Sequence, residues 1–310
     1  MKSLNIRLAG PLRSDTSEFH LDIDILMTLD QGIVGIYGAS GHGKSTLLKA
    51  IAGVFPQPKS IISTVDWYHK KSTQAHPQQE TPNGAEHNPA VYQDQSVGLF
   101  EGLTVADNLA LVARHSLWRT RRLFSQPQVI EWCEIGHLLA QRAARLSGGE
   151  KQRVGLARTL LSGKPIVLLD EPFSALDWST RLRFLALLVR LNKEHGLAIV
   201  LVSHSLKELA LCCDSIVHIE SGKIAQQGPT DEMIARLNGQ QNAPLFARIP
   251  VIFDQYLPEF HLGKWQIGQT TVFTKEPQEP VMSEKVLVID ADKVSLSKTK
   301  TESSSMLNQL

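Results

Sequence analysis

The chain has 310 residues, of which 42% are hydrophobic and 20% are charged, and its formal net charge is +1. Its length exceeds that of one average domain and predicts a large core with a smaller appendage. The near-neutral charge argues against nucleic acid as a partner, because proteins that bind the phosphate backbone usually carry a basic excess.

No apolar run approaches the length needed to span a membrane, and the N-terminus lacks the apolar core of a signal peptide. We therefore expect a protein that stays in the cytosol. The three cysteines, Cys133, Cys212 and Cys213, show no metal-ligand spacing. They are expected to be reduced thiols in the core.

The first elements along the chain are predicted to be antiparallel strands. Apolar and polar residues alternate over residues 4–8 and 19–29, which is typical of strands with one solvated face. They predict a small β-subdomain ahead of the next apolar run. The aromatic residues of this region, Phe19 and Tyr37, are expected to face the core.

A glycine-rich turn follows, between a predicted buried strand at residues 33–37 and a predicted helix at residues 45–53. Glycines let backbone N–H groups converge on phosphate oxygens, a lysine supplies a mobile positive charge, and Ser45 can ligate Mg²⁺. The pattern predicts a site for a nucleoside triphosphate, and a glycine turn that binds nothing is the alternative. The residues of the turn are Gly38, Ala39, Ser40, Gly41, His42, Gly43, Lys44, Ser45 and Thr46.

The middle of the chain carries weaker signals. A strand is predicted at residues 61–68, and the polar residues 69–89 are expected to form a solvated loop. Gln93 closes the next predicted strand, where its amide can ligate Mg²⁺ or the attacking water. Residues 104–145 have a helical pattern, and the cluster of Trp118, Arg119, Arg121 and Arg122 is expected to be a solvated helix face.

A second anion site is predicted where Ser147, Gly148 and Gly149 open a helix over residues 150–161. Next, a fully apolar strand ends in Asp170 and Glu171. Ligands sit at the carboxyl ends of parallel strands, so Asp170 is expected beside the glycine turn, where it can hold Mg²⁺.

Glu171 projects differently and can accept a proton from water attacking the γ-phosphate. His204 follows a further buried strand, predicted at residues 198–202, and can donate to the γ-phosphate.

Taken together, residues 1–235 resemble the ATPase subunit of an ABC transporter. The matching motifs are Walker A (residues 38–46), the Q-loop (Gln93), the signature motif (residues 146–152), Walker B (residues 166–171), the D-loop (residues 174–177) and the switch histidine (His204). The resemblance implies an α/β P-loop NTPase core with an antiparallel β-subdomain and an α-helical subdomain at about residues 94–150.

The resemblance also implies a head-to-tail homodimer that binds ATP and Mg²⁺. In such a dimer Ser147, Gly148 and Gly149 of one subunit cap the γ-phosphate held by Lys44 of the other. Asp177 of the D-loop belongs to the same nucleotide-binding set. A membrane permease is expected to dock near Gln93 and the helical subdomain.

Within this superfamily the sequence is most similar to the molybdate importer ATPases, in residues 146–153, 203–208 and 290–310. This implies a peripheral protein at the cytoplasmic face of the inner membrane, working with the permease and indirectly with a periplasmic solute-binding protein. Tungstate, sulfate or another solute is an alternative cargo. Two alternatives of other classes are a soluble ABC-type ATPase acting on DNA or ribosomes, and a regulatory oxyanion-binding module.

Residues 244–310 resemble part of a small oxyanion-binding β-barrel. Strands are predicted at residues 249–253, 265–273 and 286–289, and an incomplete barrel with an open edge is expected. A second departure from the family is the segment of residues 95–102, which is about two residues longer than the usual run and lacks its Pro-His pair.

Overall fold

The structure is a computed structural model that describes residues 2–14, 17–29, 32–55, 62–69, 78–80, 88–116, 123–237, 246–258, 262–275 and 284–290. The chain divides into two compact units, Met1–Met233 and Ile234–Leu310.

One ten-stranded sheet organises the first unit, in the order β5-β4-β1-β2-β10-β9-β3-β8-β7-β6. The strands β1, β2 and β4 pair antiparallel, whereas β3, β6, β7 and β8 pair parallel. The bounds are β1 (Lys2–Ser14), β2 (Ser17–Thr28), β3 (Ile33–Tyr37), β4 (Ile62–His69), β5 (Gln78–Glu80), β6 (Ala90–Gln93), β7 (Ile166–Asp170), β8 (Ala198–Val202), β9 (Ser215–Glu220) and β10 (Lys223–Pro229). The predicted antiparallel strands are thus continuous with the parallel sheet, because β10 pairs with β2 between Lys223 and Asp22.

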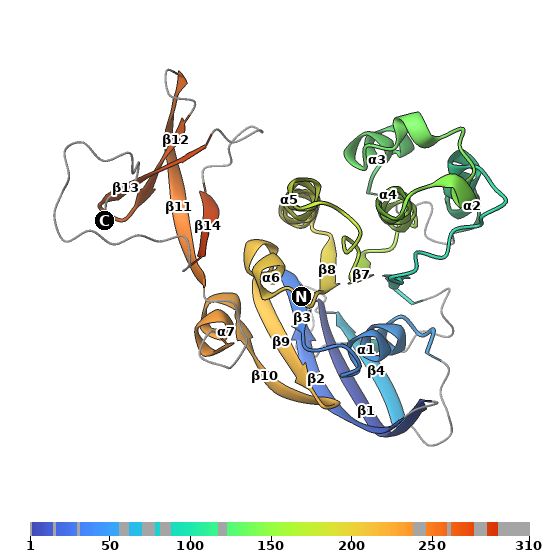
Figure 1. The fold of residues 1–310 in the computed structure, drawn as a ribbon. Helices are drawn as coiled ribbons and strands as arrows, with labels where there is room; N and C mark the ends of the chain where they lie inside the picture. The colour runs from blue at the N-terminus through green and yellow to red at the C-terminus, as the bar shows by residue number, and fades with distance from the viewer. Residues whose placement is uncertain are drawn as a thin grey trace. The chain divides into compact units, whose positions relative to one another are not determined.

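The core of this unit closes around α1 (Lys44–Ile51), which lies against β4, β6 and β7 (Figure 1). Leu47, Leu48 and Ile51 of α1 are fully buried, as the sequence pattern predicts. They pack with the inward-facing apolar residues of β1, β2, β3, β7, β8 and β9. Because alternate residues of a strand point to opposite faces, the other face of the parallel strands is left for further helices.

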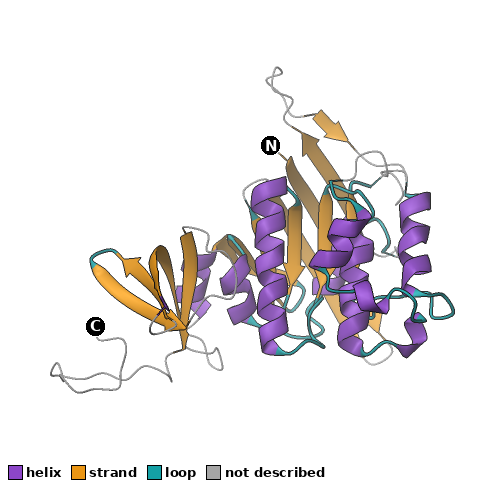
Figure 2. Ribbon diagram, turned by 90° about the horizontal axis from the view of Figure 1, so that it is seen from above, coloured by secondary structure: helices purple, strands orange, loops and turns teal. Residues whose placement is uncertain are grey.

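Those helices are α4 (Gly148–Leu160), which contacts β6, α5 (Trp178–His195), which contacts β8, and α6 (Leu206–Cys212), which contacts β3. Figure 2 shows the helices of the first unit along the sheet. Asp177 caps the start of α5 by accepting from Thr180 N, and Gly196 ends it in the left-handed conformation. α7 (Thr230–Leu237) follows β10.

The helical part consists of α2 (Val105–His115), α3 (Gln126–Trp132), two 3₁₀ turns, η2 (Gly136–Leu138) and η3 (Ala143–Arg145), and the start of α4. The helical pattern predicted over residues 104–145 is therefore divided into short pieces. Serine and threonine caps explain the divisions: Thr104 caps α2, and Ser125 opens α3 with a capping box. The cluster predicted at Trp118, Arg119, Arg121 and Arg122 lies outside the described residues.

The first unit also bears on the predicted loop of residues 69–89 and on the predicted state of the cysteines. Within the predicted loop of residues 69–89, Gln78–Glu80 forms the strand β5 and pairs with β4, so the loop prediction is wrong for these residues. Cys133, Cys212 and Cys213 are buried thiols, which confirms the prediction of core thiols. None of the helices in the described part of the chain is both long and apolar enough to cross a membrane.

The second unit contains a four-stranded antiparallel sheet in the order β13-β12-β11-β14. Its strands are β11 (Phe246–Leu257), β12 (Leu262–Ile267), β13 (Thr270–Lys275) and β14 (Glu284–Asp290). The single strand predicted over residues 265–273 is instead two strands, because the chain turns at Gly268, which has a φ of +58°. Trp265 is buried, and its Nε1 donates to Thr274 Oγ1 at 2.8 Å.

We expect Leu188→Ala to lower the free energy of unfolding of the first unit by about 2–5 kcal/mol, because truncating a buried leucine leaves a cavity. Leu188 on α5 is 0% exposed, whereas Leu182 on the same helix is 36% exposed. Leu182→Ala is therefore a matched control, expected to cost less than about 1 kcal/mol. Urea unfolding followed by circular dichroism compares the two, and equal losses would contradict the packing of α5.

Candidate active site

The glycine turn between β3 and α1 is shaped by close approach of its backbone to β9. Gly38 has a φ of +152°, and a Cβ there would lie 2.3 Å from Ile219 O. Gly41 has a φ of +83°, and nothing lies within 4 Å of the position that its Cβ would take. The turn therefore has open space above Gly41 at the start of a helix, which suits a phosphate group.

Lys44 is the buried cation of this turn. Its side chain is 5% exposed, and its Nζ donates to Gly38 O and Ala39 O, both at 2.8 Å. Burial holds the pKa of Lys44 below its usual value, although the negative charges of Glu171 and Asp170 oppose part of this shift. The ammonium group thus lies in the loop with two carboxylates near enough to favour its charged form.

Asp170 ends β7 and accepts hydrogen bonds from two hydroxyls. Ser45 of α1 is one donor, and the Tyr92 hydroxyl, 2.9 Å from Asp170 Oδ2, is the other. Burial raises the pKa of Asp170, which a nearby cation would oppose. A serine hydroxyl next to a carboxylate is a donor set that fits Mg²⁺.

Tyr92 is a functional neighbour that the sequence analysis missed. Its hydroxyl lies between Asp170 and Asp94, whose Oδ2 is 3.1 Å away. Burial and the two carboxylates raise the pKa of Tyr92, so the phenol remains a donor. Asp94 also pairs with Lys49 of α1 at 3.4 Å, which connects β6 to α1.

Glu171 lies one residue beyond β7 in a strained conformation. Its φ is +46°, a region that residues with a Cβ seldom adopt. Two side chains approach Oε2 of its carboxylate: Gln95 Nε2 donates at 3.1 Å, and His204 Nδ1 lies at 3.4 Å. The structure thus brings the predicted residues Glu171 and His204 together, and it adds Gln95, which the sequence analysis did not single out.

Gln93 lies on the opposite face of the sheet from Asp170, and its predicted role as a ligand of Mg²⁺ or of the attacking water stays a prediction. Its side chain is 2% exposed, and its Oε1 accepts from Thr159 Oγ1 of α4 at 3.4 Å. Gln93 pairs with Leu169, whereas Tyr92 pairs with Leu168, so Tyr92 and not Gln93 shares the sheet face of Asp170. The alternation of β6 is the signal that could have identified Tyr92 from the sequence.

The signature turn packs on the D-loop. Gly148 and Gly149 leave little room: an added Cβ would lie 3.2 Å from Ala175 Cβ and 2.9 Å from Leu176 Cδ2, respectively. Gln152 holds the same contact, since its Nε2 donates to Ser174 Oγ at 2.8 Å and its Oε1 accepts from Ala175 N at 2.9 Å. A movement of the signature turn would therefore displace the D-loop as well.

Ser147 and Asp177 act as helix caps within this chain. Ser147 forms a capping box with Glu150 at the start of α4, and its hydrogen bonds lower the pKa of Glu150. The hydrogen bonds that Asp177 accepts from Thr180 and Ser179 lower the pKa of its carboxyl. Among the described residues, no hydrogen bond or ion pair joins Ser147, Gly148, Gly149 or Asp177 to Lys44. Their nucleotide contacts stay predictions.

The remaining predicted residues lie on the loop and on α1. Ala39 and Ser40 are exposed, Thr46 is half-buried, and His42 Nδ1 accepts from Ser221 N at 3.4 Å. Tyr37, predicted to face the core, is half-buried with its ring 5.4 Å from that of His218. The side chain of Phe19 lies outside the described set.

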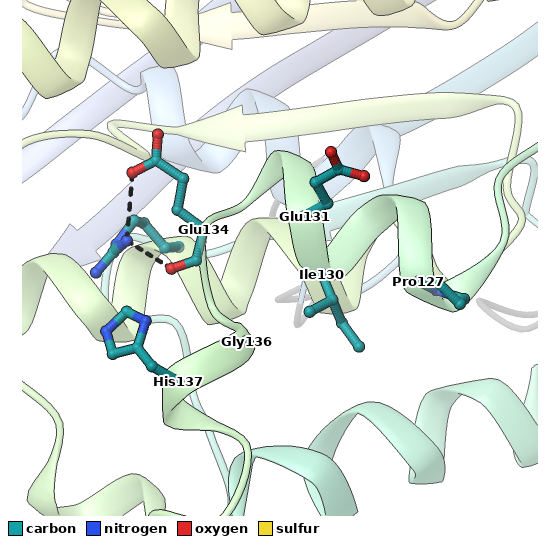
Figure 3. A pocket seen from close by; sticks show the side chains of 7 residues that line it. Pro127, Ile130, Glu131, Glu134, Gly136 and His137 are labelled. Atoms are coloured by element: carbon teal, nitrogen blue, oxygen red, sulfur yellow. Dashed lines mark hydrogen bonds and ion pairs between the residues drawn. The ribbon is translucent and has the colours of Figure 1, made fainter.

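A separate pocket of about 610 Å³ lies in the helical part (Figure 3). Arg153 Nη1 donates to Glu134 O at 2.9 Å, and Arg183 pairs with the Glu134 carboxylate at 3.1 Å. The Glu134 carboxylate is thus paired with arginines, and its contact with Arg183 joins α5 to the helical part. The lining residues are Pro127, Ile130, Glu131, Glu134, Gly136, His137 and Arg153.

A glycine turn between a parallel strand and a helix, with carboxylates at the same sheet edge, defines a P-loop nucleotide-binding protein. Residues 24–174 match the ABC transporter family. The chain is 33% identical over 299 residues to the molybdenum import ATP-binding protein ModC of Pseudomonas fluorescens, covering 94% of this chain and 81% of that protein. The protein of the same name from Methylococcus capsulatus is 32% identical over 303 residues, covering 96% of this chain and 81% of that protein. The chain therefore belongs to the ABC transporter family of ATP-binding proteins.

Solved structures agree with this fold. A dimeric ATP-binding cassette in a post-hydrolysis state with ADP and Pi has a TM-score of 0.59 at 22% identity, covering 73% of this chain and 98% of that one. A nucleotide-free ATP-binding cassette from an ABC transporter has a TM-score of 0.61 at 19% identity, covering 78% of this chain and 96% of that one. At these identities the likeness establishes the α/β cassette fold.

Tyr92→Phe is expected to raise the Mg²⁺ concentration for half-maximal ATP binding about two- to tenfold, since one net hydrogen bond contributes about 0.5–1.5 kcal/mol. The ring is kept, and only the donor to Asp170 is lost. A fluorescent ATP analogue titrated with Mg²⁺ measures this, while binding in EDTA should be unchanged. Tyr256→Phe in β11 makes the same change in the second unit as a control. Equal Mg²⁺ dependence in all three proteins would show that Tyr92 does not orient Asp170.

Proposed function

We propose that this chain is the ATP-hydrolysing subunit of a molybdate importer. The observation that carries the proposal is the similarity to molybdenum import ATP-binding proteins over more than nine-tenths of the chain. The buried lysine, the paired carboxylates and the nearby histidine support ATP hydrolysis as the source of energy. Tungstate or sulfate has no observation in its favour here.

The roles of the residues follow from their positions. The backbone of residues 38–46, the start of α1 and Lys44 bind the phosphates of ATP. Ser45 and Asp170 would hold Mg²⁺, which when bound would neutralise charge on the phosphate oxygens. Glu171 accepts the proton of the attacking water, and His204, next to Glu171, donates to the γ-phosphate. Gln93 takes part only if its side chain leaves α4.

A homodimer completes this site in the proposal. Ser147 and Gly148 are exposed at the start of α4, so they are accessible to the nucleotide of a second copy. Ser147, Gly148 and Gly149, with Asp177, would cap the γ-phosphate bound at Lys44 of the partner. The dimeric ATP-binding cassette of like fold supports this arrangement.

The proposed division of labour within the chain places nucleotide binding in residues 1–235 and a C-terminal β domain in residues 244–310. The boundary between the two compact units, near residue 233, supports this division. The helical subdomain, at about residues 94–150, would receive an integral membrane permease at the cytoplasmic face of the inner membrane. A periplasmic solute-binding protein would deliver the anion to that permease.

Uptake in a strain that lacks this chain tests the function as a whole. We expect restored uptake of labelled molybdate when the wild-type gene is supplied, and none with Lys44→Ala, which removes the mobile cation from the phosphate loop. Immunoblotting of the variant controls for its amount. Restored uptake of sulfate with no restored uptake of molybdate would overturn the proposed substrate. If the strain that lacks this chain takes up both anions normally, the proposed role in import is overturned.

Glu171→Gln separates the chemical step from binding. The amide keeps the shape of the side chain but cannot accept the proton, and loss of a positioned general base costs on the order of 10² to 10⁴ in rate. We expect ATP affinity within about twofold of wild type and a persistent ATP-bound dimer, measured by equilibrium binding, single-turnover hydrolysis and size-exclusion chromatography. Near-normal cleavage by this variant would remove Glu171 from the catalytic role.

A further inference from the structure

We propose that Gln95 is a positioning residue for Glu171 and that a clamp formed by Val97, Gly155 and Arg158 holds it in place. The inference rests on the proposed role of Glu171 in ATP hydrolysis. Gln95 lies in the segment between β6 and α2 that departs from the family pattern. It differs from Gln93, which lies two residues earlier and is buried against α4.

The contact between Gln95 and Glu171 constrains the carboxylate. Gln95 Nε2 donates to Oε2 at 3.1 Å, and His204 Nδ1 lies 3.4 Å from the same oxygen. Gln95 and His204, which lie on different loops, thus both contact Oε2 of Glu171, and Oε1 is left to accept a proton. Because Glu171 has a φ of +46°, its backbone is already strained, and side-chain contacts are needed to select one rotamer.

The N-terminal side of Gln95 is attached to α1 through Asp94. Asp94 Oδ1 accepts from Ser96 N and from Ser96 Oγ, both at 3.0 Å, which closes a tight turn around Gln95. The other oxygen of Asp94 lies 3.4 Å from Lys49 Nζ and 3.1 Å from the Tyr92 hydroxyl. The turn is therefore anchored next to the phosphate loop.

The C-terminal side of Gln95 is clamped to α4. Val97 has a φ of +63°, which is rare for a β-branched residue, and its side chain is 4% exposed. It fills a notch at Gly155, where a Cβ would lie 2.3 Å from Val97 Cγ1. The guanidinium of Arg158 donates to Val97 O and, at 2.8 Å, to Gly98 O.

These contacts distinguish Gln95 from an ordinary exposed side chain. An exposed glutamine on a mobile loop would lose much of a hydrogen bond's value to the entropy of ordering it. Here the backbone on both sides of Gln95 is already fixed, so only the side-chain torsions of Gln95 remain to be ordered when its amide meets Glu171. Such pre-organisation is what a residue needs in order to act through a catalytic group.

The first experiment removes the donor. Gln95→Leu should lower the single-turnover rate of ATP hydrolysis about ten- to hundredfold, the value of one hydrogen bond to a charged group, with ATP affinity unchanged. Gln141→Leu makes the same change at another exposed glutamine in the helical part and should have no effect. A normal rate in Gln95→Leu would overturn the proposal.

A double-mutant cycle tests whether Gln95 acts through Glu171. In the Glu171→Gln background, adding Gln95→Leu should change the residual rate less than about twofold. The same loss in both backgrounds would mean that Gln95 does not act through Glu171. If Glu171→Gln alone hydrolyses ATP normally, the proposed role of Glu171 fails and the positioning role of Gln95 fails with it. A slow Glu171→Gln protein together with a normal Gln95→Leu protein would overturn the positioning role alone.

The second experiment displaces the clamp. A Cβ at Gly155 would also lie 3.2 Å from Gln93 Nε2, so restoration by a change at Val97 is needed to separate the effect on Val97 from one on Gln93. Gly155→Ala places a methyl group where Val97 Cγ1 lies, although alanine itself favours a helix. The rate should fall about as far as in Gln95→Leu, and the double variant should fall no further. Val97→Ala added to Gly155→Ala removes the colliding atom and should restore at least half of the lost rate. A Gly155→Ala protein with normal hydrolysis, or one that Val97→Ala does not restore, would show that the clamp does not hold Gln95.

Discussion

In the parallel ladder of the first unit, Ile36 pairs with Val202, Asp170 pairs with Val202 from the other side, and Gln93 pairs with Leu169. These pairings bring the carboxyl ends of β3, β8, β7 and β6 to one level. The phosphate loop, the two carboxylates and the loop carrying His204 leave the sheet there. Because each group is fixed by backbone hydrogen bonds of a buried sheet, the site depends on strand register more than on any single side chain.

The charge states of Lys44 and Asp170 at this edge of the sheet depend on burial and on the groups around them. Burial acts against the charged forms of both Lys44 and Asp170; the charges of Glu171 and Asp170 favour the charged form of Lys44, and hydrogen bonds favour that of Asp170. Hydroxyl donors from Ser45 and Tyr92 complete the surroundings of Asp170. A carboxylate held in this way is ordered before nucleotide arrives, so little reorganisation accompanies phosphate binding.

Two strained backbone positions lie at or near the proposed reacting groups. Glu171 and Val97 both have positive φ values, and each is held by contacts from another element. A strained backbone persists only where surrounding contacts select it, so these two positions mark places where the fold constrains function. The packing of the signature turn on the D-loop gives a second such constraint, because Gly148 and Gly149 allow a contact that a larger residue would separate.

The sequence by itself determined which motifs are present and the elements that carry them. The apolar runs predicted β3 and β8 at their observed residues, because buried parallel strands are read from local composition alone. The glycine turn identified a phosphate site, since its chemistry lies within nine consecutive residues, 38–46.

Only the tertiary structure decided which side chains meet. In the structure, Gln93 of β6 faces α4, and Tyr92 faces Asp170. The hydrogen bond from Arg158 to Gly98, residues 60 apart in the sequence, belongs to the clamp that we propose holds Gln95 against Glu171. The continuity of the antiparallel strands with the parallel sheet likewise depends on one pairing, Lys223 with Asp22. These contacts join residues far apart in the chain. The alternation along β6 shows which of its side chains share a face, but strand order and helix packing decide what that face meets.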